Sequence, residues 1–208
     1  MRLVLASASP RRADLLRAAG YAFETLAVDL DERRRPGEPP ADYVARLARE
    51  KSSAAMQRFL ERAQRACHGP ERDALYDVVV LGADTTVVVD GDVLGKPADD
   101  LEAEQMLRAL SGRSHDVLTG VSLRTSSHER GRVVATSVYM TVLTPNDIAW
   151  YVASGEGRDK AGGYAVQGLA SRFIPRVDGS YANVVGLPVA TVAELLGELA
   201  SAGSSGLF

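Results

Sequence analysis

The sequence predicts an α/β protein in which helices flank a mixed β-sheet. Short apolar runs typical of buried strands alternate along the chain with segments of helical periodicity. Some of these runs are joined by short polar turns, as in β-hairpins, which a purely parallel sheet lacks. The 208 residues are 46% hydrophobic and 25% charged, as in an ordinary globular domain. We therefore expect one domain over residues 1–200 and a disordered tail over residues 201–208.

The first third of the chain predicts two strands and two helices. A short buried strand over residues 3–6 is followed by a helix, with Ser9 at its N-cap and Gly20 at its C-cap. Residues 21–28 alternate like a second strand. After a charged, proline-rich loop, a long helical pattern begins near residue 41 and continues to about residue 66.

The rest of the chain continues the mixture of strands and helices. The elements expected there, in chain order, are strands on both sides of an Asp90-Gly91 turn, a helix ending at Gly112, two strands joined through residues 126–131, a helix capped by Thr144, a turn at Asp178-Gly179 and a last helix over residues 190–200.

Composition and charge exclude several classes of function. The net charge of −3 gives no overall basic field for nucleic acid, so any anion site must be a local cluster of Lys and Arg. Cys67 is the single cysteine, which fits a reducing compartment. No apolar run approaches the roughly 20 residues of a membrane span. We expect a cytoplasmic protein that binds neither membranes nor nucleic acid.

Two arginines lie where a helix disfavours cations. Arg11 and Arg12 occupy the first helical turn, beside the positive end of the helix dipole. Either both side chains turn to solvent or pair with acids, or they hold an anion there. The backbone N–H groups and the hydroxyls of Ser7 and Ser9 would then join two guanidinium groups around phosphate oxygens.

Asp84 and Lys51 also break local rules. Asp84 lies within valine-rich strand sequence, where an acid is disfavoured. It is either a turn or bulge residue after Gly82, or a carboxylate held at a break in the sheet as a metal ligand or general base. Lys51 falls on the apolar stripe of its helix, so it either reaches past the core to the surface or projects its ammonium into a cleft.

Other polar residues are ambiguous when taken alone. Lys96 and Lys160 lie in glycine-containing loops, where a lysine is usually just solvated. Asp31 and Glu32 belong to a charge run whose simplest interpretation is a solvated loop with local ion pairs to Arg33–Arg35. His115 begins a strand and is interpreted as structural, because it has no evident catalytic partner.

Eight stretches in order resemble the Maf family of nucleoside-triphosphate pyrophosphatases, over roughly residues 2–199. They are LASASPRRADLL, DLDE, RLAREKS, GADTTVV, LGKP, LSGRSHDVLTGV, DKAGGYAVQG and VDGSYANVVGLPV. The resemblance implies a fold like that of inosine-triphosphate pyrophosphatases, with two lobes around a cleft. It also implies hydrolysis between the α and β phosphates, a divalent metal (Mg²⁺ or Mn²⁺) and a possible homodimer.

The resemblance assigns roles to individual positions. Asp84 matches the proton acceptor, and Glu32 with Asp84 supplies the hard oxygen ligands that suit the metal. The positions matching the family's phosphate cluster are Ser9, Arg11, Arg12, Glu32, Lys51, Lys96 and Lys160. The positions matching its markers of substrate preference are Arg11, Thr85 and Gln167.

GADT and DKAGGYAVQG resemble the members that act on dTTP and UTP, and modified uridine triphosphates are expected for the same reason. The amide of Gln167 suits thymine or uracil but does not exclude cytosine. Two alternatives stay open: a nucleotide-binding regulator of cell division with incidental turnover, and a 7-methyl-GTP pyrophosphatase, which Thr85 and Gln167 disfavour.

Two stretches depart from the family pattern. Residues 57–77 form a longer segment than usual, which is expected to extend a helix and loop at the periphery. Gly157 and Arg158 precede DKAGG where the family often has proline, and this difference is expected to loosen the loop that carries Lys160.

Overall fold

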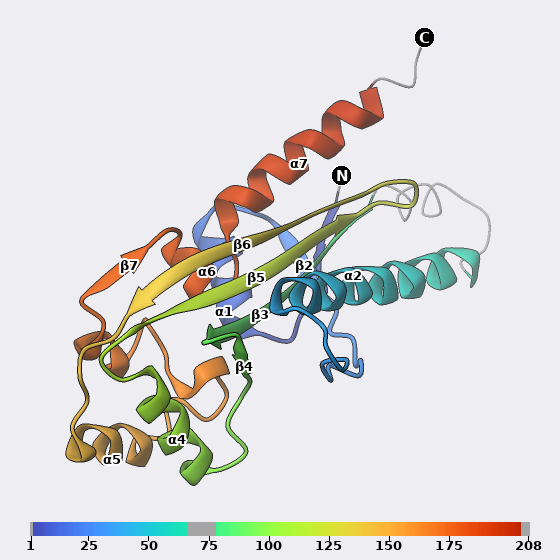
Figure 1. Ribbon diagram of the computed structural model, residues 1–208. Helices are drawn as coiled ribbons and strands as arrows, with labels where there is room; N and C mark the ends of the chain where they lie inside the picture. The colour runs from blue at the N-terminus through green and yellow to red at the C-terminus, as the bar shows by residue number, and fades with distance from the viewer. Residues whose placement is uncertain (1, 66–77, 205–208) are drawn as a thin grey trace.

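A computed structural model describes residues 2–65 and 78–204 and contains one seven-stranded mixed sheet (Figure 1). The strand order is β2-β1-β3-β5-β6-β7, with β4 paired to β3. β1 is parallel to β2 and β3, and the other pairs are antiparallel. The α/β fold class with a mixed sheet and flanking helices is therefore confirmed.

The elements in chain order are β1 (Arg2–Leu5), α1 (Pro10–Ala18), β2 (Phe23–Thr25), α2 (Pro40–Arg65), β3 (Val78–Val89), β4 (Asp92–Leu94), α4 (Asp100–Leu110), β5 (Ser114–Arg124), β6 (Glu129–Tyr139), α5 (Pro145–Ala153), the 3₁₀ helices η1 (Ala161–Gly163) and η2 (Leu169–Phe173), β7 (Arg176–Asp178), α6 (Tyr181–Val185) and α7 (Val189–Ser204).

Helices cover both faces of the sheet. α2 lies along one face, where Ala55, Met56 and Phe59 pack against Val80 and other strand residues. α1 and α7 cover the opposite face, and α4 and α5 gather with η1 and η2 around a separate apolar cluster at the far end of the β5–β6 hairpin (Figure 1). None of the described helices is both long and apolar enough to cross a membrane.

Two glycines let α2 approach the sheet closely. A Cβ atom on Gly82 would lie 2.1 Å from the carbonyl oxygen of Ala48, and one on Gly120 would lie 2.3 Å from that of Val44. Only hydrogen fits between these backbones. Gly120 is the cross-strand partner of Asp84, so the closest approach of α2 occurs beside this carboxylate.

The predicted boundaries need three corrections. β3 runs without interruption, so Asp84 lies at neither a turn nor a sheet break; neighbouring strands pair with β3 along its length and satisfy its backbone. The strand expected over residues 21–28 is limited to Phe23–Thr25, because the short β1 provides its pairing partners. α7 continues through Ser204, within the stretch assigned to a disordered tail, and residues 205–208 lie outside the described part.

The long helix is confirmed: it was expected from near residue 41 to about residue 66 and spans Pro40–Arg65. It includes the first part of the longer segment over residues 57–77. Residues 66–77 of that segment lie outside the described residues.

Candidate active site

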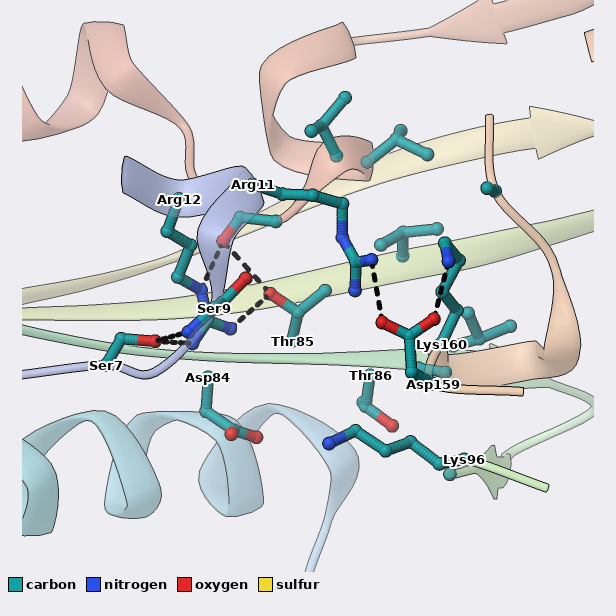
Figure 2. Close-up of a pocket in the computed structure, with 18 of the residues that line it drawn as sticks. Ser7, Ser9, Arg11, Arg12, Asp84, Thr85, Thr86, Lys96, Asp159 and Lys160 are labelled. Atoms are coloured by element: carbon teal, nitrogen blue, oxygen red, sulfur yellow. Dashed lines mark hydrogen bonds and ion pairs between the residues drawn. The ribbon is translucent and has the colours of Figure 1, made fainter. Parts of the chain in front are cut away.

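One cavity of about 470 Å³ brings together the candidate residues from distant parts of the chain. All ten of them line it: Ser9, Arg11, Arg12, Glu32, Lys51, Asp84, Thr85, Lys96, Lys160 and Gln167. Figure 2 shows many of these side chains converging from α1, from β3, from the loop that follows β4 and from the loop that precedes η1. The volume is that of an ordinary small-ligand site.

The cavity concentrates positive charge although the whole chain is acidic. Among the described residues that line it, five side chains are cationic and three are carboxylates, which leaves a net charge of +2 against −3 for the chain. The third carboxylate is Asp159, which the sequence analysis did not single out. A local cationic excess of this kind attracts anionic ligands.

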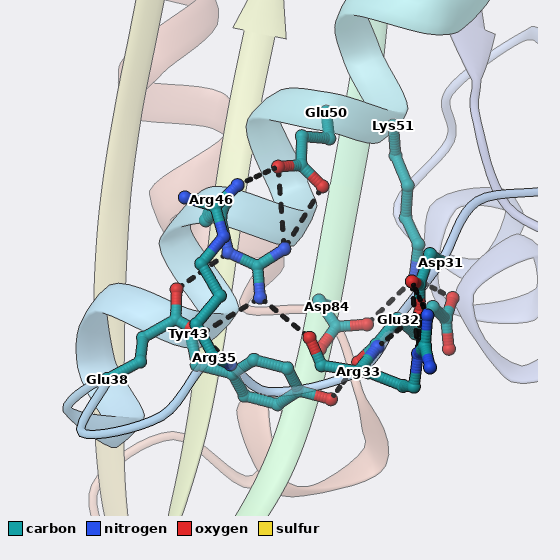
Figure 3. Close-up of polar contacts among 10 residues, drawn as sticks. All are labelled: Asp31, Glu32, Arg33, Arg35, Glu38, Tyr43, Arg46, Glu50, Lys51 and Asp84. Carbon is teal, nitrogen blue, oxygen red and sulfur yellow. Dashed lines mark hydrogen bonds and ion pairs between the residues drawn. The ribbon is translucent and has the colours of Figure 1, made fainter.

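Lys51 joins the two candidate metal ligands. Its Nζ lies 2.7 Å from Oδ1 of Asp84 and 2.6 Å from Oε1 of Glu32 (Figure 3). Lys51 is 7% exposed and Asp84 8%, so this ion pair is largely shielded from water. Of the two interpretations of Lys51, the structure shows the ammonium inside the cavity and not at the surface.

The surroundings move the pKa values of the two carboxyl groups in opposite directions. Burial raises the pKa of Asp84 above its ordinary value, although Lys51 and Arg12 draw it down. Burial also pushes the pKa of Glu32 upward, but the hydrogen bond and charge of Lys51, with Lys96 and Arg12, outweigh it and leave that pKa lowered. The two neighbouring acids therefore differ in basicity.

The loop that carries Glu32 is tied to α2. The hydroxyl of Tyr43 donates to the backbone carbonyl of Glu32 at 2.9 Å, and the Arg46 guanidinium donates to the carbonyl of Arg33 at 3.1 Å and to Glu38 at 2.6 Å (Figure 3). These contacts hold the loop ends so that Glu32 faces the cavity. Of the local ion pairs expected in this charge run, the one between Asp31 and Arg33 forms, whereas Glu32 pairs with Lys51.

Arg12 is buried and anchors the N-terminus of α1. Its guanidinium donates to the carbonyls of Gly186 and Ala83 at 2.8 Å and to the hydroxyls of Ser7 and Thr85 at 3.1 Å (Figure 2). These bonds use four of the five N–H groups of an arginine. Arg12 thus places its charge at the cavity with one N–H left for a ligand. Ser9 occupies the N-cap, but its hydroxyl makes no capping hydrogen bond.

Asp159 bridges two of the candidate phosphate ligands. One carboxylate oxygen lies 3.2 Å from Nη1 of Arg11, and the other contacts Nζ of Lys160 (Figure 2). Lys160 also donates to the backbone carbonyl of Glu156 at 2.6 Å. The Asp159 carboxylate therefore lies between these two cations and contacts both of them.

The loop carrying Lys160, where looseness is expected from Gly157 and Arg158, makes specific contacts with the rest of the fold. The Arg158 guanidinium makes two hydrogen bonds to the Asp100 carboxylate on α4, at 3.0 and 2.9 Å. A Cβ on Gly157 would lie 2.0 Å from the carbonyl oxygen of Gly163, so this position needs glycine and would not admit proline. The family's proline is replaced by a different anchor.

Two of the candidate substrate-preference positions, Thr85 and Gln167, line the same cavity. The hydroxyl of Thr85 already has hydrogen-bond partners within the protein: Thr119 at 2.9 Å, the Gly186 carbonyl at 3.3 Å and Arg12. Gln167 is exposed and lines the cavity. The apolar residues that line the cavity include Val117, Tyr164, Val166, Val184 and Val185.

His115 is structural, as its sequence context suggested. It is 4% exposed, and its Nε2 lies 2.7 Å from the hydroxyl of Tyr164, which lines the apolar wall. Its Nδ1 is buried without a hydrogen-bond partner among the described residues. Burial lowers the pKa of His115 to about 4, so the ring is neutral at neutral pH.

Sequence reasoning missed the residues that support the site. Tyr43 lies outside the quoted motifs, and Asp159 and Gly120 lie within two of them without a role being assigned to either. Their roles appear only when distant segments come together. A weak signal was available for Asp159, because it adjoins Lys160 in a glycine-rich loop.

Comparisons with known proteins agree with the resemblance read from the motifs. The family model described as "Maf-like protein" matches residues 2–199. A protein named dTTP/UTP pyrophosphatase from Shewanella oneidensis is 47% identical over 203 residues, covering 95% of this chain and 98% of that protein. Proteins of the same name from Anaeromyxobacter dehalogenans and Escherichia coli O157:H7 are 50% and 47% identical, covering 94% and 93% of this chain and 92% and 91% of their own.

Proposed function

Because the chain belongs to the Maf-like protein family, we propose that it hydrolyses dTTP and UTP to the nucleoside monophosphate and pyrophosphate. The observation that carries the proposal is the cavity itself, where a cationic cluster adjoins two carboxylates held on one lysine. The same site accepts modified uridine triphosphates, and the reaction keeps non-standard nucleotides out of nucleic acid. We place it in the cytoplasm, where its substrates are made and used.

The cationic side chains bind the triphosphate. Arg11 and Lys160 contact the two oxygens of the Asp159 carboxylate, and the phosphate replaces this carboxylate between them. Lys96 lines the same cavity, and its charge acts on Glu32. Charges fixed in this way stabilise the negative charge that develops on the leaving pyrophosphate.

The donor set fits a divalent metal that arrives with the nucleotide. Within residues 2–65 and 78–204, no group of three or more His, Cys, Asp or Glu side chains could hold a metal ion by itself. Glu32 and Asp84 nevertheless converge on one ammonium, and Mg²⁺ is commonly held by one or two carboxylates together with substrate phosphates. Glu32 and Asp84 would hold Mg²⁺ or Mn²⁺ there, and the ion would supply Lewis-acid polarisation of the phosphate oxygens.

Asp84 accepts the proton of the attacking water. Burial makes its carboxylate more basic than an exposed aspartate, and Lys51 fixes the orientation of Oδ1. Water directed at the α-phosphorus displaces pyrophosphate toward the cationic cluster. The carboxylate is held by α2 on one side and by the continuous strand β3 on the other, so it does not have to be repositioned for the reaction.

Base recognition falls to the end of the cavity that contains Gln167. Its amide offers one donor group and one acceptor, which match the O4 and N3–H edge of thymine or uracil. The surrounding valines and Tyr164 supply an apolar wall for the ring. Thr85 acts through Arg12 and Gly186, because its hydroxyl already bonds to both.

The test is turnover of separate nucleotides by the wild type and by Asp84→Asn. With Mg²⁺ or Mn²⁺, we expect dTTP and UTP to be hydrolysed in preference to CTP, GTP and 7-methyl-GTP. Asp84→Asn is expected to lower kcat by about 10²- to 10⁴-fold, the usual contribution of a general base. Products are separated by ion-exchange chromatography.

Asp116→Asn is the matched control, because Asp116 is an exposed strand acid that accepts a hydrogen bond from Ser137 and does not line the cavity. It should retain wild-type turnover. Tight nucleotide binding without turnover would instead support the regulator of cell division, and preference for 7-methyl-GTP would support the other subfamily. Either result overturns the proposal.

A further inference from the structure

The turn that presents Gln167 to the cavity is formed by residues 165–168. It is closed by a hydrogen bond from the Gly168 N–H to the Ala165 carbonyl at 3.1 Å. Val166 within it is buried in the apolar cluster, whereas Gln167 is exposed. The direction of the Gln167 side chain therefore depends on how this turn is held.

Two side chains outside the cavity lining hold the turn on both sides of Gln167. The hydroxyl of Tyr151 accepts the Ala165 N–H at 3.0 Å and donates to Oε2 of Glu156 at 2.8 Å. The other carboxylate oxygen, Oε1, accepts the Leu169 N–H at 2.9 Å. The two anchored N–H groups are two residues before and two residues after Gln167.

This Tyr151–Glu156 clamp is closely packed. Tyr151 is 1% exposed and its ring packs in the apolar cluster with Phe173. A Cβ atom on Gly168 would lie 1.8 Å from Oε1 of Glu156, so the turn fits against the carboxylate only because this residue is glycine. The clamp is therefore fixed by packing at the Tyr151 ring and by close contact with Gly168 at Glu156, although Glu156 itself is half-buried.

Glu156 also reaches the phosphate end of the cavity. Its backbone carbonyl accepts the hydrogen bond from Nζ of Lys160, while its side chain holds the turn of Gln167. Glu156 thus contacts both Lys160, a candidate phosphate-binding residue, and the turn that carries Gln167, the candidate base-recognition residue.

We propose that Tyr151 and Glu156 are positioning residues for base recognition: they set the turn that directs Gln167 at the nucleotide base and thereby determine the discrimination between bases. This inference rests on the proposed function, in which the amide of Gln167 faces the base. Tyr151 and Glu156 would then influence which base is bound, although neither residue lines the cavity.

The experiment measures binding of hydrolysis-resistant α,β-methylene analogues of dTTP and dGTP by titration calorimetry with Mg²⁺. The ratio of the two Kd values reports discrimination without requiring turnover. Tyr151→Phe keeps the ring but removes the hydroxyl that links Ala165 to Glu156, and it is expected to reduce the ratio by about five- to tenfold. Glu156→Ala should reduce it further, and Glu156→Gln should restore part of the loss.

A double-mutant cycle separates positioning from general destabilisation. In a Gln167→Ala background, Tyr151→Phe should change the ratio by less than about twofold, because the amide that the clamp directs is gone. Tyr139→Phe is the matched control: Tyr139 lies on β6 against the guanidinium of Arg176, away from the cavity lining, and this variant should keep the wild-type ratio.

An unchanged ratio in Tyr151→Phe, or equal effects in the two backgrounds, would overturn the inference while leaving the pyrophosphatase activity intact. Conversely, a wild type that binds the analogues selectively but fails to hydrolyse dTTP would overturn the proposed function. The ratio of the two Kd values in Tyr151→Phe would still test whether Tyr151 and Glu156 position Gln167.

Discussion

An aspartate at the centre of a valine-rich strand is the residue on which this site is built. Asp84 stays in the strand because Lys51 reaches it from α2 and compensates for its burial. A charge buried without its partner is strongly destabilising, so the pair cannot be understood one residue at a time. The rule that excludes acids from strands fails here because a neighbouring helix supplies the counter-ion.

His115 gives a prediction for stability at the residue scale. Its pKa in the folded protein is about 4, below the roughly 6.5 of an unfolded chain, so protons bind preferentially to the unfolded state between these values. The free energy of unfolding should therefore fall as the pH drops from about 6.5 to 4, by on the order of 3 kcal/mol from this group. His115→Gln removes the titration.

Urea denaturation of both proteins across this pH range checks the prediction. The stability difference between wild type and His115→Gln should shrink as the pH falls and level off below pH 4. Parallel profiles would mean that burial does not suppress protonation of His115.

At the scale of elements, the site depends on how closely α2 packs against β3 and β5. Gly82 and Gly120 have no side chains, and any side chain at these positions would push the helix away from the strands. Their neighbours Val44 and Ala48 lie on the turns of α2 that precede Lys51. The spacing of helix and sheet therefore decides whether the lysine reaches the carboxylate.

Gly120→Ala tests this close packing. Its Cβ would meet the Val44 carbonyl at 2.3 Å, so the helix must move away and carry Lys51 with it. We expect a loss of about 2 kcal/mol in the free energy of unfolding, as for overpacked cores, and a fall of more than about tenfold in kcat/KM. Chemical denaturation and dTTP turnover measure the two effects.

Gly197→Ala is the control for this variant. Nothing lies within 4 Å of a Cβ atom at that position on α7, and alanine favours a helix by up to about 1 kcal/mol. It should equal or exceed the wild type in stability, with unchanged turnover. Wild-type activity in Gly120→Ala would show that the site tolerates a wider separation.

At the scale of the molecule, local patterns predicted most elements but not their junctions. Capping residues and periodicity placed α1 and α2 correctly, because helix signals are local. The extent of β2 and the continuity of β3 depend on pairing with distant strands, which no window of sequence contains.

The site shows the same division. Arg12 and Lys51 could be identified from the sequence because each occupies a position that local rules disfavour. The remaining candidate site residues were identified from the order of the family motifs. The bridge formed by Asp159 and the clamp formed by Tyr151 and Glu156 were not visible, because each joins segments that meet only after folding. Tyr151 in particular was indistinguishable from an ordinary packing residue.

The most direct measurement is hydrolysis of dTTP in ¹⁸O-labelled water, followed by ³¹P NMR and mass spectrometry of the products. Attack at the α-phosphorus by water that Asp84 deprotonates predicts dTMP carrying the label, unlabelled pyrophosphate in equal amount, and loss of both in Asp84→Asn. Labelled pyrophosphate, release of dTDP and phosphate, or unchanged turnover in Asp84→Asn would contradict the assignment of the reaction to this carboxylate.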